Sequence, residues 1–312
     1  MDVAHFYLDR NTDAVEFCPH NPYSHVLAAS TYMLQEGDNP SRSGSIVLFT
    51  VDAGSCQLDL FHCLESNGIF DIKWRPVEAN IGRPLLAQAD SDGCVKVHGL
   101  ECSSDGQQEK ASSIIVGLSD GCVSVLSRSE SELQIEQEWK AHDFEMWAAS
   151  FDVHQPHLLY RGSDDCKFSC WDVCNCPSKS VFRNAKEHKM GVCCIMKSIT
   201  DPSVVLTGSY DDHIRVWDIR SISKPVNQSS ICLWGGVWRI KQHPHVPSLV
   251  LAACMHNGFA LVDLRGEEIK IVETYNRHSS LAYGKGENMV IATCSFYDRL
   301  VRIWTPQSNI FA

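Results

Sequence analysis

One pattern recurs along this chain and constrains its fold more than any other feature. A short apolar strand is followed by small residues, a polar turn, and a second strand in which apolar and polar residues alternate. The pattern is clear at 158–173, 204–219 and 249–264, and weaker at 85–100, 114–127 and 290–304. The residues at the turn position are Asp92, Asp120, Asp165, Asp211, His256 and Asp298. These positions lie 28, 45, 46, 45 and 42 residues apart, and steps in the forties match one four-stranded blade of a β-propeller.

Further strands complete the predicted blades. An inner strand precedes the hairpin in two of the clear copies, at 192–196 and 237–241. An additional first blade fits residues 13–52. Its strands are expected near 14–17, 25–30 and 45–51. The opening stretch 3–8 is predicted to supply the outer strand that closes the ring. The sequence therefore predicts an all-β propeller of seven blades, with residues 1–312 in a single domain.

Two blades depart from this plan. The step of 28 residues is too short, and the polar stretch between Leu100 and Ile114 offers no inner strand for blade three. Residues 281–290 also leave little room for the first strand of blade seven. We therefore predict that blade three lacks its inner strand, and blade seven is a candidate for the same defect. A missing inner strand would expose hydrogen-bonding edges and lower the stability.

Two copies also carry a His-Ser-Asp-Trp set, which is the layout of WD repeats. The sets are His142, Ser163, Asp165 and Trp171, and His188, Ser209, Asp211 and Trp217. We expect the Asp to accept a hydrogen bond from the His, the His to meet the Ser, and the Ser to accept from the Trp indole. Such a network satisfies each buried polar group, so these residues are interpreted as structural.

Composition narrows the functional classes. The net charge is −11, whereas a nucleic-acid binder normally presents a basic face; an acidic surface suits a basic partner, a cationic ligand or plain solubility. No apolar run is long enough to span a membrane, and the first residues carry early acids rather than the apolar core of a secretory signal. The 15 cysteines are odd in number, which favours reduced thiols. We therefore expect a cytoplasmic protein, monomeric, that binds neither nucleic acid nor membrane.

Several runs carry more than a generic repeat. They are HKMGVCCI (188–195), TGSYDDHIRVWDIR (207–220), GGVWRIKQHPHVPSLVLAACMHNGF (235–259) and ATCSFYDRLVRIW (292–304). Residues 142–152 and 162–172 add to the match, and 15–19 and 71–74 add to it more weakly. With these runs the chain resembles the diphthine methylesterase family of WD-repeat proteins. The resemblance is strongest over 139–304, and residues 35–45 and 102–113 contribute nothing to it.

The resemblance implies an enzyme of diphthamide biosynthesis. Its reaction would be hydrolysis of the methyl ester of methylated diphthine on eukaryotic translation elongation factor two, which gives diphthine. No cofactor or metal is implied, and water is the second substrate. The alternative is a non-catalytic WD-repeat adaptor, because most propellers are interaction scaffolds. A methyltransferase is poorly supported by the sequence, since it lacks the Gly-rich strand-to-helix turn that binds many methyl donors.

Ester hydrolysis requires an attacking oxygen, a base, and a donor for the developing oxyanion. His256 stands where five other copies have Asp, and we hypothesise that it is the general base. Arg239 is a candidate for the oxyanion or the ester carbonyl, and Cys254 is a candidate thiol nucleophile. Each has a structural alternative: a hydrogen bond within blade six, a surface salt bridge, and a core position, respectively. The nucleophile remains open.

Diphthine carries a trimethylammonium group, which aromatic faces and carboxylates hold well. The candidates near the ends of inner strands and at the turns are Trp147, Trp238, Tyr210 and Tyr297, with Glu145 and Asp212 as acids. Propeller packing is the alternative role for each of them. Two other motifs are set aside. Ser119 in Gly-Leu-Ser-Asp-Gly falls in a hairpin turn, and the cysteines at 166–176 lack the spacing of a zinc site.

Overall fold

In the computed structural model of this chain, the described residues form β-strands and one short 3-10 helix at Tyr23–His25. It describes residues 1–37, 39–52, 54–55, 57–76, 84–99, 113–129, 132–174, 180–266, 268–278, 282–287 and 290–307. The chain divides into two compact units, one of residues 1–109 and 276–312, the other of residues 110–275. None of the described residues form a helix that is long and apolar enough to cross a membrane.

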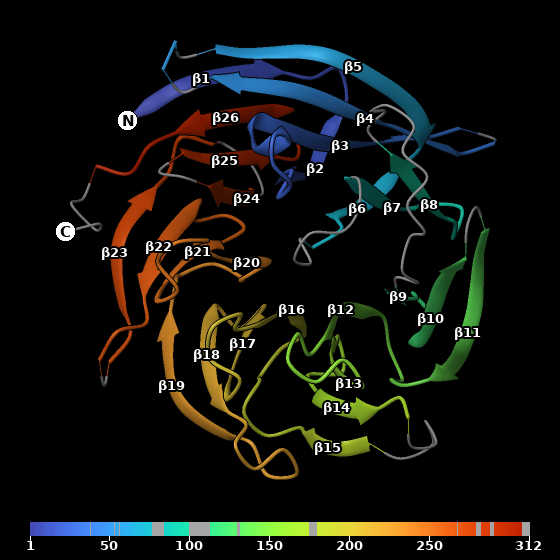
Figure 1. The fold of residues 1–312 in the computed structure, drawn as a ribbon, viewed down its shortest axis with the longest axis vertical. Helices are drawn as coiled ribbons and strands as arrows, with labels where there is room; N and C mark the ends of the chain where they lie inside the picture. Colours follow the sequence, from blue (N-terminus) through green and yellow to red (C-terminus); the bar gives the residue numbers. More distant parts are fainter. Residues whose placement is uncertain are drawn as a thin grey trace. The chain divides into compact units, whose positions relative to one another are not determined.

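The first unit contains three antiparallel sheets in its described part, drawn in blue, cyan and red in Figure 1. Blade one has β2 (Asn11–Phe17), β3 (Val26–Gln35), β4 (Ser41–Asp52) and β5 (Gln57–Asn67). Blade two has β6 (Ile69–Trp74), β7 (Leu85–Asp90) and β8 (Val95–Gly99). Blade seven has β24 (Ala282–Glu287), β25 (Val290–Ser295), β26 (Leu300–Trp304) and, on the outside, β1 (Asp2–Tyr7). The predicted pairing of the opening stretch as an outer strand is therefore confirmed.

Blade seven corrects one prediction. Its inner strand β24 is present and pairs residue by residue with β25, from Ala282 opposite Ser295 to Glu287 opposite Val290. Residues 281–290 were judged to leave little room for a strand, and the segment Ala-Tyr-Gly-Lys-Gly-Glu that forms it also has weak strand propensity. Strand propensity is a weak guide where a neighbouring strand supplies a full ladder of hydrogen bonds.

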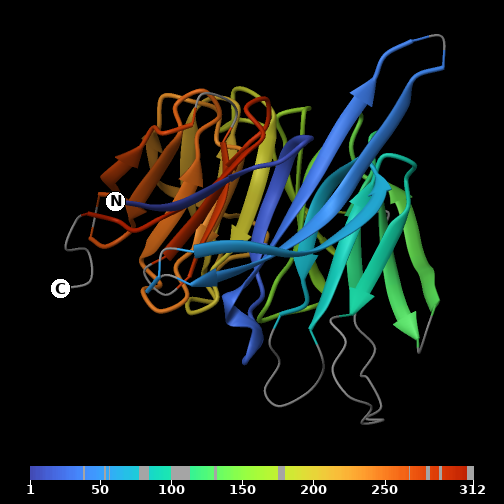
Figure 2. The same cartoon turned by 90° about the horizontal axis from the view of Figure 1, so that it is seen from above.

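The hairpin of β3 and β4 extends beyond the part of the sheet that pairs with β2. β2 pairs with β3 only as far as Tyr32, whereas Met33–Gln35 continue to pair with Ser41–Ser43 of β4. Figure 2 shows the end of this hairpin, in blue, extending past β2. Gln35 and Ser41–Ser43 of this extension fall in the range 35–45 that gave no sequence signal.

The second unit contains the other four sheets of the described chain, from green to orange in Figure 1. Blade three has β9 (Ser113–Gly117), β10 (Cys122–Ser129) and β11 (Glu132–Lys140). Blade four has β12 (Met146–Phe151), β13 (Leu158–Ser163), β14 (Phe168–Asp172) and β15 (Ser180–Asn184). Blade five has β16 (Val192–Lys197), β17 (Val204–Ser209), β18 (His213–Asp218) and β19 (Val226–Cys232). Blade six has β20 (Arg239–Gln242), β21 (Leu249–Ala253), β22 (Phe259–Asp263) and β23 (Lys270–Tyr275).

Blade three has three strands in the described chain, ordered β11-β10-β9, and no inner strand precedes β9 there. The prediction from the 28-residue step concerns residues 100–112, which lie outside the described residues, so it stays a prediction. The Met146 N–H at the start of β12 donates to the Leu118 carbonyl, just after β9. The next blade therefore supplies one partner at this end of the shortened sheet.

The predicted histidine-to-aspartate hydrogen bond forms in blade four only. In blade five the Asp211 carboxylate pairs with Arg215, and His188 Nδ1 has no hydrogen-bond partner among the described residues. In both blades the hydroxyl of the network is not the predicted one.

In blade four, His142 Nδ1 lies 3.0 Å from Asp165, while His142 Nε2 and the Trp171 indole meet Ser169 Oγ at 3.3 and 3.4 Å. Ser163 is not the link. Its hydroxyl donates instead to the Glu145 carbonyl, at 2.7 Å, just before the inner strand.

The same correction applies in blade five. His188 Nε2 and the Trp217 indole meet Thr207 Oγ1 at 2.9 and 2.8 Å, and Ser209 donates to the Met190 carbonyl at 3.1 Å. The sequence offered two hydroxyl residues, two positions apart on the same strand face. Only Thr207, which lies farther from the turn than Ser209, reaches the indole of Trp217.

Blades four and five each pair an arginine with a hydroxyl residue across two strands, but the two residue types occupy opposite strands in the two blades. Thr207 faces Arg215 across blade five, and Arg161 faces Ser169 across blade four. Arg215 pairs with Asp211 through both terminal nitrogens, at 2.9 and 2.8 Å. Arg161 is fully buried between the rings of Trp139 and Trp171, 4.4 and 4.7 Å from their centroids. Its guanidinium has no hydrogen-bond partner among the described residues, and burial lowers its pKa to about 9.

We expect Arg161→Met to stabilise the protein by about 1–3 kcal/mol, because it removes a buried charge that lacks a counter-ion. The two cation–π contacts reduce this gain. Urea unfolding measures it. The matched control is Arg215→Met, which strands the buried carboxylate of Asp211 and should cost about 3 kcal/mol. A loss of stability in Arg161→Met equal to that of the control would contradict the assignment of Arg161 as uncompensated.

Stability should also depend on pH through His188. Burial lowers the pKa of His188 to about 3, below the 6.5 of an exposed histidine. Between these values the unfolded chain binds the extra proton, so this contribution to stability is full above pH 6.5 and declines as the pH falls. The slope is at most about 1.4 kcal/mol per pH unit. Urea unfolding across this window should show a shallower slope for His188→Gln, and an unchanged slope would refute the assignment.

Candidate functional site

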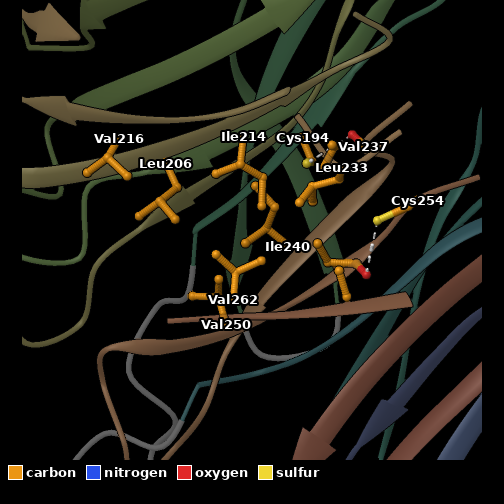
Figure 3. Packing of buried hydrophobic residues seen from close by; sticks show 12 residues of the cluster. Cys194, Leu206, Ile214, Val216, Leu233, Val237, Ile240, Val250, Cys254 and Val262 are labelled. Carbon is orange, nitrogen blue, oxygen red and sulfur yellow. Dashed lines mark hydrogen bonds between the residues drawn. The ribbon is translucent and has the colours of Figure 1, made fainter. Parts of the chain in front are cut away.

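Blade six replaces the whole polar network with apolar side chains. The strand registers align His188, Thr207, Asp211, Arg215 and Trp217 of blade five with Leu233, Ala252, His256, Ala260 and Val262 of blade six. All but His256 belong to one buried cluster that blades five and six share (Figure 3). His256 therefore departs from Asp because no histidine or arginine remains beneath the turn for a carboxylate to bind.

His256 lies in a tight turn between β21 and β22 and is exposed. The Cys254 N–H donates to the Gly258 carbonyl at 2.7 Å, and the Asn257 N–H donates to the Cys254 carbonyl at 2.6 Å. The Asn257 side chain donates to the Leu233 carbonyl at 2.8 Å, which ties the turn to the loop before β20. The turn is thus held rigidly while the His256 imidazole faces solvent.

Three of the predicted cage residues meet. We call Trp147, Tyr210 and Trp238 the aromatic cluster. Its ring centroids lie 5.2 Å apart for the two tryptophans, 6.2 Å for Trp147 and Tyr210, and 5.8 Å for Tyr210 and Trp238. Trp147 and Trp238 are the second residues of equivalent inner-strand segments in blades four and six, and Cys193 holds that position in blade five. The small side chain of Cys193 lets the two tryptophans meet across blade five.

Two glycines position Tyr210 within the cluster. A Cβ on Gly191 would lie 2.7 Å from Asp164 Oδ1 and 3.2 Å from the Tyr210 ring. A Cβ on Gly236 would lie 2.8 Å from Met255 Sδ and 3.3 Å from the same ring. Any larger residue at either position would displace the ring or its neighbours, so the close approach depends on glycine.

Acidic groups surround the cluster. Burial raises the pKa of the Tyr210 hydroxyl, and the nearby carboxylates of Asp164 and Glu145 raise it further. Glu145 and Asp164 are both exposed. Glu145 was predicted, whereas Asp164 was missed because it directly precedes the network residue Asp165 and resembles ordinary turn sequence. Aromatic faces with two carboxylates form a surface that favours a quaternary ammonium cation.

The remaining predicted residues lie in different surroundings. Asp212 is partly buried in the turn of blade five, where its carbonyl accepts from the Leu233 N–H at 2.7 Å. Arg239 is partly buried on β20, opposite Ala253. Tyr297 belongs to the first unit, is 71% exposed and contacts the Phe296 ring edge-on. Its membership of the aromatic cluster stays a prediction, as do the roles of Asp212 and Arg239.

Cys254 lies in the core of blade six. It is fully buried, and its thiol donates to the Ala252 carbonyl at 3.7 Å (Figure 3). Burial raises the pKa of Cys254 to about 12, which disfavours the thiolate that a nucleophile requires. These features favour the core role over the nucleophilic one. The described residues contain no group of histidines, cysteines and acids arranged to hold a metal ion.

Comparisons with known proteins identify the repeat and several relatives. Residues 179–218, which include the hairpin of blade five, match the model of the WD domain, G-beta repeat. The chain is 30% identical to the human protein named diphthine methyltransferase, over 87% of this chain and 71% of that protein. It is 32% identical to the mouse protein of that name, over 87% of this chain and 66% of the relative's length. It is 28% identical to the Dictyostelium discoideum homolog, over 96% and 98%.

A solved structure supports the fold. A chain in the crystal structure of a mitotic checkpoint complex superposes with a TM-score of 0.73 at 12% identity, covering 99% of this chain and 96% of that one. At this identity the likeness concerns the fold alone. Together with the WD-domain match and the seven sheets of the described chain, it confirms the predicted WD-repeat β-propeller.

We expect the aromatic cluster to bind choline more tightly than its neutral isostere 3,3-dimethylbutan-1-ol, because only choline carries the charge. Trp147→Ala should weaken choline binding by about threefold to thirtyfold, as expected for a lost cation–π contact. Glu145→Gln should weaken it less, since that carboxylate is exposed. Tryptophan fluorescence titration measures each affinity. Equal affinity for the two ligands would contradict a cation site.

Proposed function

The chain belongs to the diphthine methyltransferase family, and from this premise we propose that it acts on methylated diphthine of translation elongation factor two. The reaction we propose is hydrolysis of the methyl ester, which leaves diphthine and methanol. The partner is the modified elongation factor, water is the second substrate, and no cofactor takes part. We place the reaction in the cytoplasm, where the factor works.

The observation that carries this proposal is the aromatic cluster with its two neighbouring acids. The substrate side chain bears a trimethylammonium group and a methyl ester, so a site that holds the cation also positions the ester. Trp147 and Trp238 come from blades that flank blade five, and Tyr210 lies against both rings. Glu145 and Asp164 supply negative charge at the same place.

His256 fits the role of general base in this reaction. A water molecule attacks the ester carbonyl while the imidazole takes its proton, giving a tetrahedral oxyanion. The oxyanion collapses, the methoxy group leaves, and the imidazolium returns the proton to form methanol. The new carboxylic acid then loses its own proton to solvent. Because His256 is exposed on a rigid turn, its ring can reach a bound substrate without disrupting the core.

Arg239 is the candidate for stabilising the oxyanion. It follows Trp238 directly on the inner-strand segment of blade six, so it shares a segment with the cation site. A guanidinium placed near a developing oxyanion lowers the barrier electrostatically. Its role rests on this placement and requires the same kinetic test as that of His256.

Mass spectrometry of elongation factor two carrying methylated diphthine tests the reaction. Incubation with this chain should convert the modified residue from the methyl ester to the free acid, with methanol released and no methyl donor needed. Conversion that requires S-adenosylmethionine, or a gain of methyl groups, would indicate methyl transfer instead. No change, with the chain folded and binding the factor, would favour the adaptor role.

His256→Asn should lower kcat by about 10²–10⁴-fold and leave KM nearly unchanged, because the base acts in the chemical step. Asparagine suits a turn, so the fold should survive; thermal melting checks this. His25→Asn, which replaces a histidine of blade one, is the matched control and should keep full activity. Activity of His256→Asn equal to that of the control would exclude His256 as the base.

A further inference from the structure

Trp234 is the most exposed tryptophan of the described chain. Its side chain is 76% exposed, and its backbone has a φ of +61°, in the left-handed region that bulky residues avoid. Equivalent loops of blades four and five carry Asp143 and Lys189 at this position, both polar and exposed. An exposed aromatic in a strained backbone costs stability, so its presence calls for a role outside the fold.

The strain is imposed by the residues on either side. The Leu233 N–H donates to the Asp212 carbonyl at 2.7 Å, and the Leu233 carbonyl accepts from the Asn257 side chain at 2.8 Å. On the other side, a Cβ on Gly235 would lie 2.2 Å from the Cys254 carbonyl oxygen, so this backbone is pressed against the blade six turn. The chain between these two anchors turns outward and presents the Trp234 ring to solvent.

The position of Trp234 adjoins the proposed site on two sides. Gly236, two residues further on, lies against Tyr210 and Met255. Asn257, which holds Leu233, directly follows His256. The loops before the inner strands of blades four and five also expose large apolar residues, Phe144 at 60% and Met190 at 52%. Loops of three successive blades thus each expose a large apolar side chain, and we call Phe144, Met190 and Trp234 the apolar rim.

We propose that Trp234, as part of this apolar rim, is a specificity-determining residue that contacts the polypeptide around the modified residue of the protein substrate. This inference rests on the proposed function. The aromatic cluster and His256 would contact only the modified side chain, so they would accept any ester that carries a quaternary ammonium group. Trp234 adds affinity for the folded protein that carries it, as large aromatic residues do at protein interfaces.

The decisive variant is Trp234→Gly. Glycine adopts a φ of +61° without strain, so the variant removes the ring and should melt no lower than the parent. Its Kd for methylated elongation factor two, measured by interferometry, should rise about tenfold to a hundredfold. Its kcat/KM for glycine betaine methyl ester, a small molecule with the same cation and ester, should stay unchanged. Trp234→Phe should recover part of the affinity.

The control is Ile135→Ala, which removes a 63% exposed apolar side chain from the outer strand β11 and should change neither readout. Unchanged affinity of Trp234→Gly for the factor would overturn the inference. An equal loss on the factor and on the small ester would also overturn it, because the ring would then belong to the ester site. If the parent binds the factor but hydrolyses neither substrate, the proposed function fails, and the Kd comparison still decides the role of Trp234.

Discussion

A blade must either provide hydrogen-bond partners for the polar side chains that it buries or bury apolar side chains instead. Blades four and five follow the first course, and blade six follows the second. Blades four and five bury a histidine and a tryptophan that meet at one hydroxyl, Ser169 or Thr207. Groups that are buried and hydrogen-bonded in this way hold the fold together and cannot contact a substrate. Blade six instead buries alanine, valine and leucine at those positions. The residue at its turn therefore has no buried histidine or arginine to bind, so a histidine at this position is available for a role in chemistry.

The period of the repeat predicted the hairpins because strand pairing and turn chemistry both act locally. It failed where a neighbouring strand decides the outcome. β24 forms from a glycine-containing segment with little strand propensity, since β25 offers it a complete ladder. The choice of Ser169 and Thr207 over Ser163 and Ser209 depends on which hydroxyl reaches the tryptophan indole. Ser169 shares β14 with Trp171, whereas Thr207 reaches Trp217 from the neighbouring strand β17, so the spacing of the repeat did not give the partner.

The sequence predicted the three aromatic residues that meet and the acid Glu145, but it missed Asp164 and the strained backbone of Trp234. Trp147 and Trp238 were predicted because they lie near the start of inner strands and because aromatic faces suit the cation that the resemblance implies. Asp164 was hidden beside the structural Asp165, and only the structure brings its charge to Tyr210. The left-handed backbone of Trp234 has no sequence signature, because glycine is the residue normally read as a sign of positive φ.

The loss of the network in blade six also explains how Trp234 comes to be exposed. Where blades four and five have histidine, Leu233 enters the apolar cluster and is anchored from both sides of its backbone, by Asp212 and by Asn257. The chain must then leave the core at once, and the next residue takes up the strain of that reversal. The same set of apolar replacements therefore frees the imidazole of His256 and projects the ring of Trp234. The proposed base and the proposed recognition residue thus lie on two loops of blade six that Asn257 joins, and both follow from a single change in how the blade satisfies its interior.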